Sequence, residues 1–211
     1  MHLLITAGPT REPIDAVRFI SNRSSGRMGV ALARAGAAAG HAVTLLLGPV
    51  EDPPALPADV ALHRFQSTAE LGQLLDAHAP ACDALLMAAA VADYTVAEPT
   101  ADKLPRAGQR TLTLTPTPDL VAAAAAQRRP GQVIVAFALE PAERLPSRAM
   151  DKLRRKGVDA IVANPLETMD AGDVTATLLT AAGERHAPGA MSKDAFAKWL
   201  IEQVERLHAT G

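Results

Sequence analysis

The sequence predicts a three-layer, Rossmann-like α/β fold with a mainly parallel central sheet, and two observations lead to this prediction. Strand-like and helix-like segments alternate along the 211 residues, which is the arrangement of α/β proteins. Residues 83–91 and 133–138 are almost wholly apolar, as expected of central parallel strands buried on both faces. No internal repeat or convincing domain boundary interrupts this pattern, so we expect a single domain over residues 1–211.

In the first half of the chain, the predicted elements are bounded by residues that stop or cap them. Those elements are the strand 2–7 before Gly8-Pro9, the helix 26–39 before Gly40, the strand 42–47 before Gly48-Pro49, the helix 68–78 after Ser67 or Thr68, and the strand 83–91.

In the second half, a polar stretch with prolines over about 98–116 predicts a flap. The other predicted elements are a short strand 111–115, a helix 118–127 with Pro118 in its first turn, a strand 133–138, a helix 142–156 before Gly157, a strand 159–163, a small hairpin of 174–179 with 185–188 around Gly183, and a terminal helix 192–208.

Composition excludes several classes of protein. The formal charge of -2 shows no basic excess of the kind that nucleic-acid binding requires. No apolar run approaches the roughly 20 residues that span a bilayer, and the N-terminus lacks the pattern of a signal peptide. Cys82 has no cysteine to pair with, so we expect a small buried core residue and a protein of the reducing cytoplasm.

The loop after the first strand is rich in hydrogen-bond donors. It carries Arg18, Arg23 and Arg27 and leads into a helix at Ser24-Ser25-Gly26. Free N–H groups at a helix N-terminus bind anions, and guanidinium groups suit phosphates. The loop therefore favours phosphate binding over an ordinary strand–helix connection with a solvated basic loop.

Two well-known nucleotide motifs are not present. The sequence contains no Walker phosphate loop, and its glycines come too late after the first strand for the dinucleotide fingerprint. A short-chain reductase would also need a lysine four residues after a tyrosine, whereas position 98, four residues after Tyr94, is Glu98.

Lysine is rare in this chain, with five residues against sixteen arginines. Lys152 and Lys156 are spaced to share one face of a helix, while Arg154 and Arg155 between them are expected to point elsewhere. Lysine and arginine are not interchangeable at many sites, so each lysine is a candidate for a specific role. A solvated basic face is the alternative.

The runs Ile5 to Gly29 and Ala88 to Tyr94 closely resemble the synthetase domain of bacterial phosphopantothenoylcysteine synthetases. The resemblance implies a ligase in which the carboxylate of 4′-phosphopantothenate attacks the α-phosphate of CTP, giving an acyl-cytidylate and pyrophosphate. The amine of L-cysteine then displaces CMP. It also implies Mg2+ with the triphosphate, a homodimer with shared site residues, and a separate flavin-dependent decarboxylase downstream, with no flavin on this chain.

The resemblance also implies individual roles. Asn22, Arg18 and Ala90 match positions around the acyl intermediate, and Lys103 matches a flap lysine that contacts phosphate during the first step. The remaining nucleotide-binding positions are Ser24, Ser25, Gly26, Ala89, Asp93, Pro118, Asp119, Leu120, Val121, Phe137, Lys152 and Lys156. Asn164 matches a family position without an assigned role, and the metal ligands stay unassigned.

The flap departs from the family pattern. The family has Lys-x-Lys-Lys, whereas this chain has Lys103-Leu104-Pro105-Arg106, so one basic group is lost and the flap is stiffer. Three hypotheses therefore remain: the ligase, an NAD(P)-dependent reductase, and a nucleotide-binding homologue that has lost catalysis. The likeness to bacterial sequences favours CTP over ATP.

Overall fold

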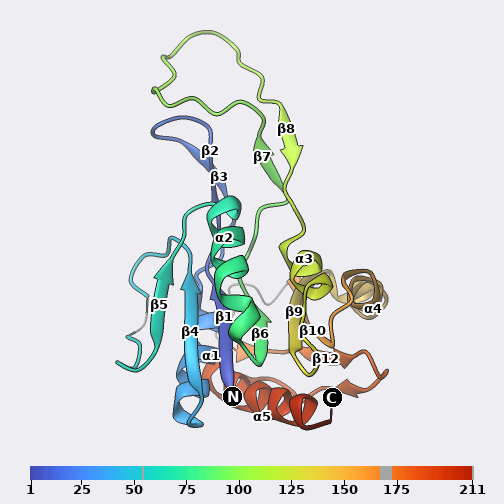
Figure 1. Cartoon of the computed structure of the whole chain (residues 1–211). Coiled ribbons are helices and arrows are strands. Elements are labelled where there is room, and N and C mark those ends of the chain that lie inside the picture. The colour runs from blue at the N-terminus through green and yellow to red at the C-terminus, as the bar shows by residue number, and fades with distance from the viewer. Residues whose placement is uncertain (54, 167–172, 211) are drawn as a thin grey trace.

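The computed structural model describes residues 1–53, 55–166 and 173–210. Its centre is an eight-stranded sheet in the order β13-β12-β10-β9-β6-β1-β4-β5 (Figure 1). The strands of this sheet are β1 (His2–Ala7), β4 (Ala42–Leu47), β5 (Ala61–Arg64), β6 (Ala84–Met87), β9 (Val133–Glu140), β10 (Ala160–Pro165), β12 (Thr177–Thr180) and β13 (Arg185–His186).

Within this sheet, β5, β4, β1, β6, β9 and β10 are all parallel to one another, and β12 and β13 add an antiparallel edge. This confirms the predicted mainly parallel sheet. The chain order reverses between β1 and β6, because β4 and β5 lie on one side of β1 while β6, β9 and β10 lie on the other. In open α/β sheets, ligands bind at the carboxyl ends of the strands beside such a reversal.

Helices cover both faces of the sheet. The helices are α1 (Arg27–Ala38), α2 (Thr68–His78), α3 (Leu120–Ala126), α4 (Leu145–Lys156) and α5 (Lys193–Thr210), with 3-10 turns η1 (Ala79–Ala81) and η2 (Ala142–Arg144). Residues of α1 and α5 share one buried cluster with the sheet, and residues of α2, α3 and α4 share the other. The three-layer prediction is therefore confirmed.

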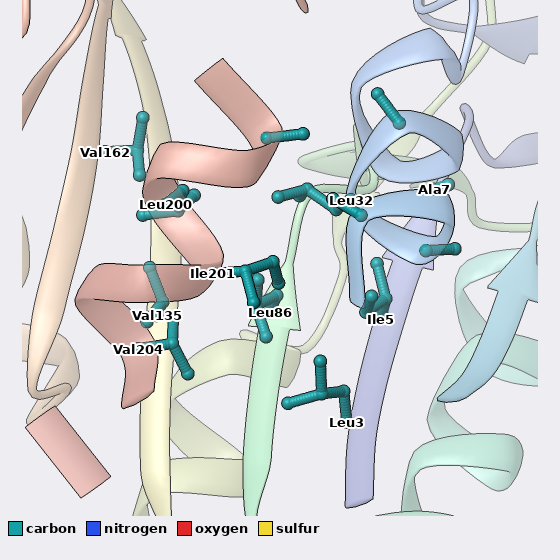
Figure 2. Packing of buried hydrophobic residues seen from close by; sticks show 14 of the residues in the cluster. Leu3, Ile5, Ala7, Leu32, Leu86, Val135, Val162, Leu200, Ile201 and Val204 are labelled. Carbon is teal, nitrogen blue, oxygen red and sulfur yellow. The ribbon is translucent and has the colours of Figure 1, made fainter. Parts of the chain in front are cut away.

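Alternation along β1 shows how the two cores form. Leu3 and Ile5 belong to the cluster beneath α1 and α5, whereas Leu4 belongs to the opposite cluster, because successive side chains of a strand point to opposite faces. In Figure 2, Ile201 of α5 lies against Leu86 of β6. Each fully buried aliphatic side chain of this kind contributes about 1.5–3 kcal/mol.

Two antiparallel hairpins extend beyond the carboxyl ends of the sheet, opposite the N-terminus (Figure 1). The first pairs β2 (Arg11–Pro13) with β3 (Phe19–Ser21), and the second pairs β7 (Tyr94–Val96) with β8 (Leu114–Pro116). Residues 97–113 join β7 to β8 without a helix or strand. We call residues 97–113 the flap; they overlap most of the segment 98–116 predicted as one.

Several predicted boundaries were wrong. The strand 83–91 ends at Met87, the helix 118–127 begins at Leu120, and the strand 111–115 lies at Leu114–Pro116. Asp119 caps the helix by accepting a hydrogen bond from the N–H of Ala122 at 3.1 Å, so Pro118 lies outside the first turn. A cap supplied by a side chain sets the helix start more strongly than a proline.

The small C-terminal hairpin is confirmed for β12 and β13. Val174, predicted to belong to it, instead lies in β11 (Asp173–Val174), which pairs with β14 (Met191–Ser192). Cys82 is fully buried, as predicted, and burial raises the pKa of its thiol. Among the described residues, no helix combines the length and apolar character needed to cross a membrane.

Candidate active site

A cavity of about 660 Å³ opens at the carboxyl ends of the parallel strands. It is lined by residues from the loops after β3 and β6, from the C-terminal parts of β9 and β10, and from α1, α3 and α4. Fourteen of the residues predicted to form the site line it: Asn22, Ser24, Ser25, Gly26, Ala89, Ala90, Asp93, Pro118, Asp119, Leu120, Val121, Phe137, Lys152 and Lys156. Segments far apart in the sequence therefore meet at one site.

The N-terminus of α1 forms one wall of this cavity. Gly26 adopts a left-handed conformation with φ 70°, and its N–H donates to Ser24 Oγ at 3.3 Å. At Gly29, an added Cβ would lie 2.3 Å from the Cβ of Ala7 and 2.9 Å from the carbonyl oxygen of Thr6. Only glycine permits α1 to approach the end of β1 so closely, and this approach brings the helix N-terminus to the cavity.

Asn22 and Ala90, which the resemblance assigns to the acyl intermediate, are in direct contact. The Nδ2 of Asn22 donates to the carbonyl oxygen of Ala90 at 2.8 Å, and the N–H of Thr10 donates to the same oxygen at 3.2 Å. The N–H of Ala90 donates to the carbonyl oxygen of Gly8 at 2.9 Å. Hydrogen bonds between the loops after β1 and β6 thus continue where the regular strand pairing ends.

Positive side chains dominate the cavity. Of its described lining residues, six are lysine or arginine and two are carboxylates, namely Arg23, Arg27, Lys152, Arg155, Lys156, Lys193, Asp93 and Asp119. The prediction that Arg155 points elsewhere was wrong, because it lies three residues after Lys152 and so shares that helix face. A concave site with an excess of positive charge attracts and binds polyanions such as a triphosphate.

The two predicted phosphate lysines each pair with a carboxylate. The Nζ of Lys156 lies 2.7 Å from both oxygens of Asp119, and the Nζ of Lys152 lies 2.6 Å from Oε1 of Glu140. Burial raises the pKa of Asp119, but the hydrogen bonds from Lys156 and from the N–H of Ala122 outweigh it, leaving the pKa below its usual value. These pairs orient the lysines at the cavity wall.

Glu140 was not among the predicted site residues. Its carboxylate is 7% exposed at the end of β9 and also accepts a hydrogen bond from Arg148 at 3.0 Å. The hydrogen bond from Lys152 holds the pKa of Glu140 below its usual value. The signal available in the sequence was the spacing of Arg148 and Lys152, which places both on the face of α4 that meets the end of β9.

Asn164 lines the cavity and lies near the end of β10. Its Oδ1 is buried and has no hydrogen-bond partner within the described residues. A buried acceptor without a partner is rare in native proteins, so a bound molecule with a donor group at this place would be stabilised. Phe137 of the neighbouring strand β9 also lines the cavity.

Lys103 and Arg18 do not line the cavity as the structure has it. Arg18 pairs with the carboxylate of Asp15 and donates from Nη2 to the carbonyl oxygen of Leu104 at 2.9 Å, while the N–H of Leu104 donates to Asp15 at 3.1 Å. The hydrogen bond from Arg18 holds the pKa of Asp15 far below its usual range. Asp15 thus anchors the flap beside the β2–β3 hairpin and keeps the exposed Lys103 there.

Residues 1–207 match the family described as the C-terminal domain of the DNA/pantothenate metabolism flavoprotein. The chain belongs to this family. A prokaryotic relative named cysteine/cysteine sulfinic acid decarboxylase is 44% identical over 81% of this chain and 47% of its own length. The coenzyme A biosynthesis bifunctional protein CoaBC of Vibrio vulnificus (strain YJ016) is 37% identical over 97% of this chain and 52% of its own length. The chain therefore spans about half the length of the curated relatives it matches.

The fold of this chain also matches that of a solved structure from a related protein. The C-terminal domain of a coenzyme A biosynthesis bifunctional protein CoaBC has a TM-score of 0.85 and 29% identity, over 100% of this chain and 96% of that one. The Rossmann-like sheet with its added antiparallel edge is thus the fold of this family.

Proposed function

We propose that this protein is a phosphopantothenate–cysteine ligase of coenzyme A biosynthesis that uses CTP. The observation that carries the proposal is the contact between Asn22 and Ala90 at a cavity that also holds the N-terminus of α1 and the two lysines of α4. Family membership and the likeness to CoaBC proteins support it. The name of the decarboxylase relative describes a protein of which this chain covers 47%.

The reaction requires two displacements. A carboxylate oxygen of 4′-phosphopantothenate bonds to the α-phosphorus of CTP as the bond to pyrophosphate breaks. The amine nitrogen of L-cysteine then bonds to the acyl carbon, loses a proton, and CMP leaves. The first step depends on holding two anionic substrates together, and the second on placing the amine of L-cysteine beside the acyl carbon. Positioning and charge neutralisation therefore supply most of the catalysis.

The cavity provides groups suited to both requirements. Lys152, Lys156 and the free N–H groups at the start of α1 would bind the triphosphate. Asn22 would contact the acyl group next to Ala90, and Asp93 would bind the ribose or base. Lys103 would reach the α-phosphate bound at the site of a second protomer after the flap moves, because lids commonly close only on bound substrate.

Mg2+ fits this site through the nucleotide. No group of three or more metal-binding side chains occurs among the described residues, and Asp93 and Asp119 are the carboxylates of the cavity wall. Mg2+ is usually held by one or two carboxylates together with substrate phosphates. Bound in this way, Mg2+ would neutralise charge on the phosphates.

The proposal includes a cytoplasmic homodimer. The two hairpins and the flap carry exposed apolar side chains, which an interface with a second protomer would remove from water: Val17, Phe19, Tyr94, Leu112 and Leu114. Arg18 and Lys103, which lie on these same projections outside the cavity, would then serve the site of the partner. Light scattering measures the molecular mass of the protein in solution and so tests the homodimer. A mixing experiment tests whether residues of both protomers form one site.

In that experiment, purified Asn22→Asp and Lys103→Gln proteins are mixed and allowed to exchange subunits. If each site combines Asn22 of one protomer with Lys103 of the other, mixing restores about a quarter of wild-type turnover, because half of the dimers are mixed and each has one intact site. If both residues serve the site of their own protomer, mixing restores nothing.

The deciding assay follows pyrophosphate and the amide product with CTP, 4′-phosphopantothenate and L-cysteine. Asn22→Asp should still release pyrophosphate but form little amide, and Lys103→Gln should stall before pyrophosphate release. Titration with ATP in place of CTP tests nucleotide choice. NADPH oxidation, CTP binding without turnover, or CO2 release from cysteine sulfinic acid would each contradict the ligase proposal.

A further inference from the structure

Two threonine hydroxyls hold the backbone of a single residue, Ala92, at the edge of the cavity. Ala92 is 7% exposed; its N–H donates to Oγ1 of Thr10 at 3.0 Å and its carbonyl oxygen accepts from Oγ1 of Thr117 at 2.5 Å. The N–H of Thr117 donates to the carbonyl oxygen of Asp93 at 3.0 Å. We call Thr10, Ala92 and Thr117 the threonine clamp.

The clamp joins three segments from distant parts of the chain, two of which line the cavity at Ala92 and Thr117. Thr10 lies in the loop after β1, and Ala92 precedes Asp93. Thr117 begins the segment that continues to Asp119. The carboxylates of Asp93 and Asp119 thus depend on the same hydrogen bonds for their relative positions.

Buried groups on the far side hold Thr10 in place. Thr10 is fully buried, and its Oγ1 lies 3.4 Å from Oγ1 of Thr68. The N–H and hydroxyl of Thr68 donate to the buried carboxylate of Glu12 at 2.9 and 2.7 Å. Buried polar networks whose members are all satisfied are rigid, so this side of the clamp is a fixed support.

The clamp also lies at the root of the second hairpin. The chain leaves the cavity through Ala92 into β7 and returns from β8 into Thr117. The hydrogen bond from Thr117 to Ala92 closes the base of this hairpin, so a movement of the hairpin or the flap need not be passed on to the cavity wall. The flap can therefore change position while Asp93 and Asp119 stay in place.

We propose that Thr10 and Thr117 are positioning residues for the nucleotide, acting through Ala92 to fix Asp93 and Asp119 while the flap moves. This inference rests on the proposed function. Neither hydroxyl needs to touch the reacting atoms. Their loss should raise the KM for CTP more than it lowers kcat.

The test compares Thr10→Val and Thr117→Val, which remove only the hydroxyl, with Thr10→Ser and Thr117→Ser, which keep it. Each valine variant should raise the KM for CTP by about 3- to 10-fold, the loss expected for one hydrogen bond, with kcat changed less than twofold and the serine variants near wild type. Thr180→Val is the matched control, because Thr180 is 2% exposed and its hydroxyl accepts from the N–H of Glu184 at 3.1 Å in the β12–β13 hairpin.

A wild-type KM in the valine variants would overturn the proposal, as would equal effects of valine and serine or an equal rise in Thr180→Val. If the wild-type protein makes no product, the proposed function fails and amide hydrogen exchange decides the clamp. Faster exchange at Asp93 and Thr117 in Thr10→Val than in Thr180→Val then supports the clamp, and equal exchange refutes it.

Discussion

The cavity and the flap are held in different ways. The cavity wall is built at the ends of parallel strands, and backbone hydrogen bonds join its loops, as between Ala90 and Gly8. The flap has no helix or strand, and two contacts with the β2–β3 hairpin hold it. The carboxylate of Asp15 anchors it through Arg18 and Leu104, and the N–H of Thr100 donates to the carbonyl oxygen of Ile14 at 3.2 Å.

The difference explains where the predicted residues lie. Loops that follow the parallel strands come together wherever the sheet forms, so Asn22 and Asp93 line one cavity. Lys156 lines it from the C-terminal end of α4, which packs on the sheet. Lys103 has no such constraint, and it lies where the anchor at Asp15 holds its neighbour Leu104. Backbone topology therefore positions the cavity, whereas a few local contacts with the β2–β3 hairpin position the flap.

The largest expected effect is on the cavity wall. In Gly29→Ala the new Cβ would lie 2.3 Å from the Cβ of Ala7, with backbone atoms on either side. We expect a loss of about 3 kcal/mol or more in the free energy of unfolding, since neither backbone can yield. Urea titration measures it. In the flap, Gly108→Ala meets nothing within 4 Å and should change stability by less than about 0.5 kcal/mol. Equal effects would contradict the contrast.

The next effect is on nucleotide binding. Removing the charge in Lys156→Gln should weaken CTP binding by a factor of about ten to one hundred, the range for a hydrogen bond to a charged group. Calorimetric titration with CTP measures the affinity. Lys198→Gln, on the exposed side of α5, removes the same charge away from the cavity and should bind CTP normally. If both variants lose affinity alike, general charge rather than the site is responsible.

A smaller effect is expected at Glu140. Glu140→Gln keeps the size of the side chain but removes the charge that orients Lys152, so CTP binding should weaken by about 3- to 10-fold. Glu205→Gln removes a carboxylate that pairs with His41 at 2.8 Å instead and serves as the control. Tighter CTP binding in Glu140→Gln would mean that Glu140 competes with the nucleotide for Lys152.

The smallest effect concerns pH and the flap. Because the pKa of Asp15 lies far below its unfolded value of about 4, its contribution is present above that value and is lost only as the pH falls through the lower folded pKa. Tryptic cleavage after Lys103, Arg106 and Arg110 should therefore not change between pH 6 and 8, once corrected for trypsin activity on a peptide. Asp15→Asn should be cleaved faster at every pH in this range. Equal cleavage rates would show that Asp15 does not hold the flap.

Much of the fold follows from the sequence because its signals are strong. Apolar runs and glycine stops predicted β1, β4, β9 and α1 closely, and Ser67 caps α2 by accepting from the N–H of Glu70 at 3.3 Å. The strands β2, β3, β5 and β7 were missed because each is three or four residues long and mostly exposed or polar, so no clear alternation marks it.

The site residues also divide into those that the sequence predicted and those that it did not. Most of the predicted residues that line the cavity came from a resemblance carried by two sequence motifs. Thr117 is only the first residue of the segment 117–121 that resembles the family, and neither Thr117 nor Glu140 was assigned a site role. Their importance depends on what lies next to them after folding. The single domain and the individual roles of the site residues stay predictions for the experiments above.

Both borders of the central sheet are short. At one side β13 has two residues, and at the other β5 has four, which include Arg64. A neighbouring chain that offers a strand finds few unpaired backbone groups at either border, and short, charged border strands discourage such pairing. Growth of this sheet from one molecule into the next, and the aggregation that follows from it, is therefore disfavoured.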